Sequence, residues 1–76
     1  MNTEEKMVFE VMYHKYRRML ISKKEMAQES GVSCSTLDRL RRMGIGVSYI
    51  KQDAGNVMYP LTEVAKYIIS AQTKTL

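Results

Sequence analysis

The chain has one cysteine, one histidine, one proline and no tryptophan among its 76 residues. A single cysteine excludes an intrachain disulfide, and together with the lone histidine it leaves no Cys/His cluster to hold a metal. The same scarcity leaves no nucleophile with a matched base and an orienting group, so we expect no catalytic residues and no bound cofactor. These absences favour a binding protein in a reducing compartment.

No apolar run is long enough to span a bilayer, and no signal-peptide pattern is present, so we expect a cytoplasmic protein without a membrane partner. The length suits one small domain, residues 1–76, with a thin core. Nine of the twelve Lys and Arg residues lie between positions 14 and 51, where only three Asp and Glu residues occur. This central positive charge favours a polyanionic partner, although a basic helix on a membrane surface would share it.

Residues 22–43 predict two short helices joined by a tight turn. Ser22 and Glu25 are spaced as a capping box at the start of the first helix. Gly31 can supply the positive φ angle that ends this helix. Ser33 can then cap the second helix by accepting backbone N–H groups.

The second of these helices, residues 33–43, has an apolar side and a polar side. Leu37 and Leu40 share the apolar side, and two arginines with a serine lie roughly opposite them. Arginine suits bidentate contacts with guanine edges, and hydroxyls reach bases or phosphates. The residues expected to contact bases or the groove are Ser35, Thr36, Arg39 and Arg42. The residues expected to contact phosphates are Lys23, Lys24, Ser33 and Arg41. The alternative is a helical hairpin whose basic face simply meets water.

The spacing of the core positions of bacterial helix-turn-helix proteins is found at Ala27, Gly31, Val32, Leu37 and Leu40. A longer run resembles the small excisionase-like and MerR-like winged-helix domains, at residues 21–27, 31–33, 35–39 and 64–68. The resemblance covers about two-thirds of the chain. It implies a sequence-specific double-stranded DNA-binding protein, either a transcriptional regulator or an excisionase-like accessory factor in DNA recombination. With no effector domain following, no small-molecule effector is expected.

Residues 3–20 predict an N-terminal helix whose apolar coverage is broader than one contact surface requires. The excess, including Phe9 and Tyr13, either contacts a second protomer, giving a homodimer through this helix, or packs in the core. A second class of function therefore remains open, a protein–protein interaction module that binds its partner through this Met- and Tyr-rich helix. RNA binding is less favoured, because no aromatic stacking motif is evident.

Residues 46–59 predict a β-hairpin at the position of a wing, because β-branched and aromatic residues flank a turn. Lys51, Gln52 and Asn56 lie near its tip and would reach the DNA backbone or minor groove. Residues 62–71 predict a C-terminal helix that closes the core, and residues 72–76 are expected to fray. The expected fold is mainly α with a small β-hairpin: a winged helix-turn-helix with an extra N-terminal helix and a C-terminal helix.

Overall fold

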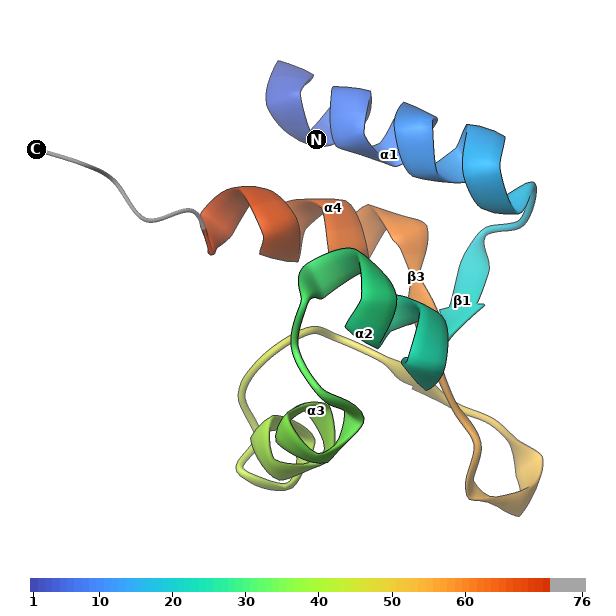
Figure 1. Cartoon of the computed structure of the whole chain (residues 1–76), viewed down its shortest axis with the longest axis vertical. Helices are drawn as coiled ribbons and strands as arrows, with labels where there is room; N and C mark the ends of the chain where they lie inside the picture. Colours follow the sequence, from blue (N-terminus) through green and yellow to red (C-terminus); the bar gives the residue numbers. More distant parts are fainter. Residues whose placement is uncertain (72–76) are drawn as a thin grey trace, which may run out of the picture.

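The computed structural model describes residues 1–71, apart from the side chain of Ala54, and is mainly helical with a small antiparallel sheet (Figure 1). The elements, in chain order, are α1 (Thr3–Tyr16), β1 (Leu20–Ser22), α2 (Lys23–Ser30), α3 (Cys34–Arg42), β2 (Ile50–Lys51), the 3₁₀ turn η1 (Asp53–Gly55), β3 (Val57–Pro60) and α4 (Leu61–Ser70). This confirms the expected fold class at the level of mainly helical with a small β element. The expected fraying of residues 72–76 lies outside the described residues.

The sheet has three strands, with β3 in the centre, β1 on one side and β2 on the other. Both pairings are antiparallel; Ile21 of β1 lies opposite Tyr59, and Ile50 of β2 lies opposite Met58. The expected hairpin is therefore present as β2 and β3, but its first strand is only two residues long. The third strand, β1, lies where the sequence of residues 19–21 allows either a helix end or a short strand, just before the cap at Ser22.

Helix α1 ends at Tyr16, so the expected boundary at residue 20 is wrong. Arg17 takes a left-handed conformation with φ 56°, and its N–H donates to the Tyr13 carbonyl at 2.8 Å. That conformation costs a non-glycine residue about 1–2 kcal/mol. The turn releases the next residues to pair with β3, which leaves Ile21 completely buried. Burial of Ile21 offsets the backbone cost of the turn.

Strand β3 runs directly into α4 at Leu61, one residue before the expected start. The Leu61 N–H donates to the Met19 carbonyl at 2.8 Å, so the bonding between the β1 and β3 segments continues into the first residue of the helix. Leu61 and Val64 are completely buried. The core consists of side chains from all four helices, β1 and β3: Met12, Ile21, Met26, Leu37, Val57, Tyr59, Leu61, Val64 and Ala65.

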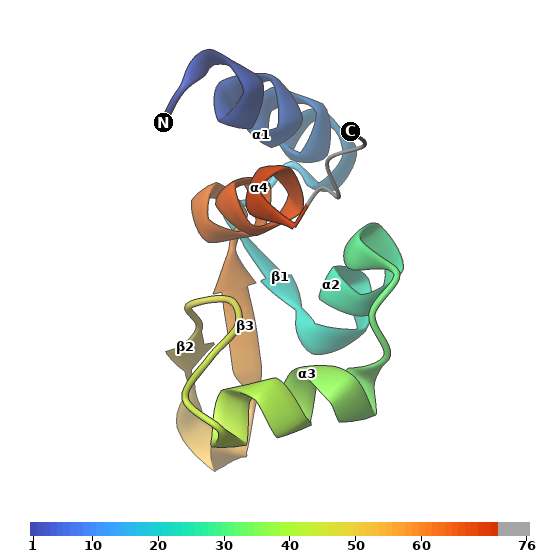
Figure 2. The same cartoon turned by 90° about the vertical axis from the view of Figure 1, so that its left-hand side faces the viewer.

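Helix α1 lies along α4 at one end of the molecule, and α3 lies at the opposite end (Figure 2). The tip of the β2–β3 hairpin is at the same end as α3 (Figures 1 and 2). None of the helices in residues 1–71 is long and apolar enough to cross a membrane. The fold thus presents α3 and the hairpin tip together, away from α1.

Candidate nucleic-acid interface

The turn between α2 and α3 is built by local contacts, as expected. Ser22 and Glu25 form the predicted capping box, in which each side chain accepts the other residue's backbone N–H. This backbone hydrogen bond from Ser22 is the main reason that the pKa of Glu25 lies below its ordinary value. Gly31 ends α2 with φ 73°, and Ser33 caps α3 by accepting the Thr36 N–H. These contacts fix where α3 begins.

Helix α3 has the two sides that its sequence predicts. Leu37 is only 4% exposed, and Leu40 is half-buried against the loop that follows the helix. Ser35, Arg39 and Arg42 are all exposed. The leucines therefore anchor the helix, and the serine and the two arginines face solvent.

The two exposed arginines keep donors available for a ligand. Among the described residues, Arg39 makes no hydrogen bond or ion pair. Arg42 donates through Nε to the Asp38 carbonyl at 3.3 Å, one turn back along the helix. That contact aligns the Arg42 side chain with the helix and uses one of its five N–H groups.

Asp38 joins two residues that had been expected to contact phosphate. It accepts hydrogen bonds from Lys23 Nζ at 2.9 and 3.1 Å and from an Arg41 terminal nitrogen at 3.2 Å. The hydrogen bonds from Lys23 and Arg41 hold the pKa of Asp38 below its ordinary value. The three charges hold the first turn of α2 against the middle of α3.

Arg41 is directed toward the protein rather than toward solvent. Its guanidinium lies 5.5 Å from the centre of the Tyr49 ring, and its side chain is 24% exposed. Its Nε is buried and has no hydrogen-bond partner within the described residues. Arg41 therefore attaches the loop before β2 to α3. One of its terminal nitrogens donates to Asp38, and in the described part of the chain these terminal nitrogens are its only donors that reach a hydrogen-bond acceptor.

The remaining expected phosphate contacts differ in availability. Lys24 is exposed, whereas the hydroxyl of Ser33 already donates to Thr36 Oγ1 at 2.9 Å. Thr36 is half-buried. Lys24 lines a hollow of about 380 Å³ together with Lys23 and Asn56. The structure thus brings the start of α2 and the hairpin tip to the same surface depression.

The hairpin tip exposes Lys51, Gln52 and Asn56. The Gln52 N–H donates to the Asn56 carbonyl at 2.7 Å, and the Gly55 N–H donates to the Gln52 carbonyl at 3.3 Å. These backbone contacts close the turn, so the three polar side chains remain outside it. The tip carries a single lysine and the carboxylate of Asp53, which keeps its net charge near zero.

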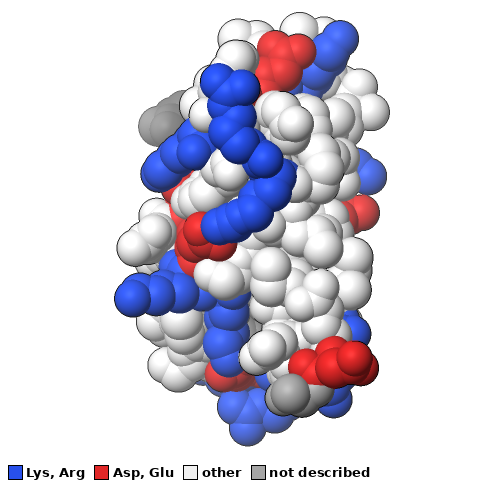
Figure 3. All heavy atoms as spheres, turned by 90° about the vertical axis from the view of Figure 1, so that its right-hand side faces the viewer, with Lys and Arg blue, Asp and Glu red and all other residues white. Residues whose placement is uncertain are grey.

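The basic residues near the end of α1 form a separate cluster. Lys15 pairs with Glu29 at 2.6 Å, and Arg18 pairs with Glu25. Tyr16 also donates its hydroxyl to Glu29. Positive side chains run down one edge of this view of the molecule with acidic ones among them (Figure 3). Part of the central positive charge in the sequence therefore attaches α1 to α2.

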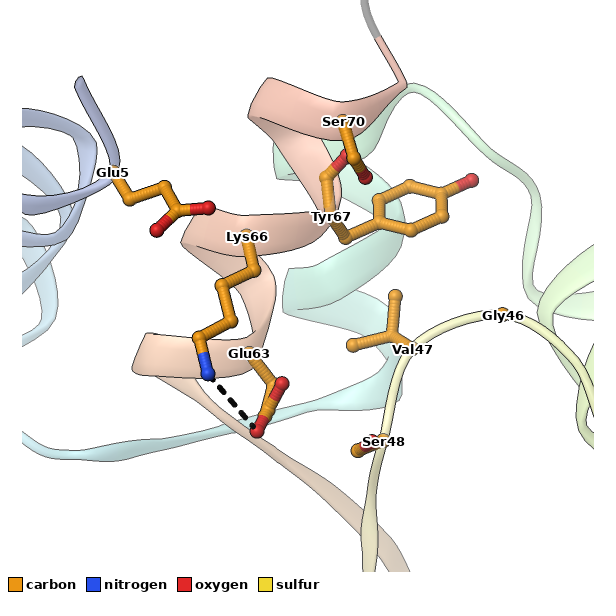
Figure 4. A pocket seen from close by; sticks show the side chains of 8 residues that line it. All are labelled: Glu5, Gly46, Val47, Ser48, Glu63, Lys66, Tyr67 and Ser70. Carbon is orange, nitrogen blue, oxygen red and sulfur yellow. Dashed lines mark hydrogen bonds and ion pairs between the residues drawn. The ribbon is translucent and has the colours of Figure 1, made fainter. Parts of the chain in front are cut away.

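A different hollow, of about 250 Å³, is lined by α4, the loop after α3 and Glu5 of α1. Figure 4 shows Lys66 turned toward Glu63, while the Tyr67 hydroxyl points away from both. The Lys66–Glu63 separation is 3.9 Å. Within residues 1–71, no three His, Cys, Asp or Glu side chains gather as metal ligands would. The polar groups of this hollow do not converge on one point.

Sequence reasoning did not anticipate two contacts that shape the interface. The Asp38–Arg41 spacing is a local signal for an ion pair, but the pairing of Asp38 with Lys23 depends on the tertiary fold. Stacking of Arg41 on Tyr49 likewise depends on the path of the loop.

No protein-family model matches this chain, and neither the curated proteins nor the solved structures yielded a match.

Proposed function

We propose that this chain is a sequence-specific double-stranded DNA-binding protein, a winged helix-turn-helix in which α3 enters the major groove. The observation that carries the proposal is the solvent-facing set of Ser35, Arg39 and Arg42 on a helix anchored by Leu37. A helix in the major groove needs one side fixed to the protein and polar groups on the other. Guanidinium groups that are free to reach base edges are the donors that recognise guanine.

Phosphate contacts would come chiefly from residues other than Lys23 and Arg41. Both of these side chains already pair with the Asp38 carboxylate in the free chain. Lys24 in the first turn of α2 and Lys51 on the hairpin are exposed and remain available. We therefore assign the main backbone contacts to these two lysines, with Ser33 contributing through its position at the start of α3.

The β2–β3 hairpin takes the place of the wing. Its tip lies at the same end of the molecule as α3 (Figure 1), which allows both to meet one duplex. Gln52 and Asn56 carry amide groups that suit the sugar–phosphate backbone or the minor groove. With one lysine at the tip, the wing contributes less electrostatic attraction than α3 does.

Two biological roles use this recognition equally well. One is a transcriptional regulator, and the other is an excisionase-like accessory factor that shapes DNA for recombination. Both require specific binding to duplex DNA by a small protein. A single α3 reads only a few base pairs, so either role needs several bound copies for useful specificity in a genome.

The test is selection of bound sequences from random duplex DNA, followed by titration of the selected site at increasing salt. We expect a defined motif and an affinity that falls steeply with salt, because lysine and arginine displace condensed counterions. Lys6 is exposed on α1, so Lys6→Ala removes the same single positive charge as an alanine substitution at Lys24 or Lys51 would. This control should not change the affinity. Failure to enrich any motif would refute sequence-specific reading.

An interaction module is the second candidate, and a specific observation favours it. Met7 and Val11, one helical turn apart on α1, are 62% and 70% exposed, so together they offer an apolar surface to a partner. A protein adaptor would show no steep salt dependence with DNA. Selection without enrichment, together with DNA binding that is weak at every salt concentration, would favour this second function.

A further inference from the structure

The exposed apolar flank of α1 forms one side of a surface hollow at the end of the molecule remote from α3. Met7 and Val11 line the hollow of about 330 Å³ together with Val8, Met12, Ile68 and one charged residue, Glu29 of α2, which pairs with Lys15. Met12 is buried, whereas Met7 and Val11 are mostly exposed. Apolar surface thus continues from the core outward between α1 and α4, with the Glu29 carboxylate of α2 beside it.

This flank differs from the pair expected to meet a second protomer. Phe9 is half-buried against the core, and Tyr13 stacks on it with ring centres 6.1 Å apart. Phe9 is thus covered by the core, and Tyr13 remains 39% exposed. Met7 and Val11 are the most exposed of the large apolar side chains described in α1.

Charge along α1 indicates what covers this flank. The first turn carries Glu4 and Glu5, and the last turn carries His14 and Lys15. Two such helices packed side by side in opposite directions place the acidic start of each beside the basic end of the other. Packed in the same direction, they would place like charges together.

We propose that the flank is the contact with a second copy of this chain, in which α1 packs antiparallel on α1 around Val11. Glu4, Met7, Val11 and His14 recur at steps of three, four and three residues, the spacing of one helix face that meets another helix. In this arrangement the two Val11 side chains face each other across the two-fold axis. Glu4 of each copy then lies toward the His14 end of its partner.

The size of the flank sets the strength of this contact. A stable interface covers roughly 800 Å² on each partner, and a patch of two exposed apolar residues with a shallow floor covers less. We therefore expect reversible association that is visible only at elevated protein concentration. The contact leaves α3 uncovered, because α1 and α3 lie at opposite ends (Figure 2). The inference does not rest on the proposed function.

Sedimentation velocity over a wide concentration range tests the association. We expect the wild-type chain to shift from monomer to dimer as concentration rises. Val11→Lys should weaken the dimer by about tenfold or more, because it places two like charges against each other in an apolar contact. Ile45→Lys is the matched control, since Ile45 is also exposed, at 54%, but does not line this hollow. A wild-type chain that stays monomeric throughout would overturn the proposal.

Cross-linking tests the geometry independently. In a Cys34→Ser background, Val11→Cys should form a disulfide-linked dimer on mild oxidation, because the two-fold axis brings the introduced thiols together. Glu10→Cys, exposed on another side of the same helix, should cross-link poorly. Glu4→Cys should also fail, because antiparallel packing separates the two ends. Efficient cross-linking through position 4 or 10, or none through position 11, would refute the antiparallel contact.

Discussion

Lys23 Nζ lies 2.9 Å from Asp38 Oδ1, and this contact joins the first turn of α2 to the middle of α3. Asp38 also accepts a hydrogen bond from Arg41, which in turn lies against the Tyr49 ring. The position of α3 is therefore set by leucine burial on one side and by this charged contact at its edge. Lys23 thus serves to orient the helix.

Replacement of Asp38 by asparagine should lower stability in a pH-dependent way. The hydrogen bonds from Lys23 and Arg41 lower the pKa of Asp38 from its ordinary 3.8. A carboxyl group whose pKa is lowered by folding stabilises the folded state when the pH is above its ordinary pKa. This stabilisation is lost as the pH falls through the folded-state pKa. Urea unfolding should therefore show a lower midpoint for Asp38→Asn at neutral pH, and the two midpoints should converge on acidification below about pH 4.

Glu25 and Glu29 also have lowered pKa values, and both proteins retain them. Their contribution therefore cancels in the difference between wild type and Asp38→Asn. A difference that stays constant down to strongly acidic pH would show that the Asp38 charge does not stabilise α3.

Replacement of Arg39 by alanine should weaken binding to the selected DNA site by about 1–3 kcal/mol. The proposed bidentate contact with a base edge would be lost, so preference at one position of the motif should relax as well. Binding curves on the motif and on single-base variants measure both effects. Equal weakening on every sequence would make Arg39 a phosphate contact instead.

Glycines 44 and 46 allow backbone strain to be separated from steric contact. Gly44 has φ 76° with open space around its missing Cβ, whereas Gly46 has φ 95° and a Cβ there would lie 3.2 Å from Leu40 Cβ. Gly44→Ala should cost about 1–2 kcal/mol through its left-handed backbone alone. Gly46→Ala should cost more, because Leu40 must also move. Chemical unfolding of the two variants shows which one loses more stability. Equal losses in the free energy of unfolding would show that the loop moves away from Leu40 without cost.

Arg17→Gly should stabilise the chain. Arg17 is the one described non-glycine residue with a positive φ, and glycine adopts that conformation without the steric cost. The expected gain is about 0.5–1 kcal/mol, less than the full strain because glycine also loses more entropy on folding. His14→Gly, inside the same helix, should instead destabilise by about 1 kcal/mol. A rise in melting temperature for Arg17→Gly and a fall for His14→Gly would confirm that α1 ends where the structure places it.

Features governed by near neighbours in the chain could be predicted from the sequence. The Ser22–Glu25 capping box, the left-handed Gly31 and the two-sided character of α3 depend on residues within a turn or two. The end of α1 could not be predicted, because Arg17 carries none of the glycine signal that marks such turns. Residues 19–21 allowed either a helix end or a short strand, and the sequence could not decide between them because β1 is stabilised by its pairing with β3.

The same distinction holds for the candidate interface. Exposure of Arg39 and Arg42 follows from helical spacing, so the sequence could predict it. The ion pair that Lys23 forms could not be predicted in this way, because its partner Asp38 lies fifteen positions further along the chain. Arg41 was expected to contact phosphate, yet its guanidinium lies against the ring of Tyr49 in the loop before β2, which helical spacing alone does not predict.

The division of α3 into an anchored side and a solvent side has an evolutionary consequence. Ser35, Arg39 and Arg42 are exposed and take no part in the buried core, so they can be exchanged as a set at little cost to folding. Asp38, Leu37 and Arg41 have no such freedom. A gene duplication followed by three substitutions could therefore redirect the helix to new ligands while the scaffold stays intact.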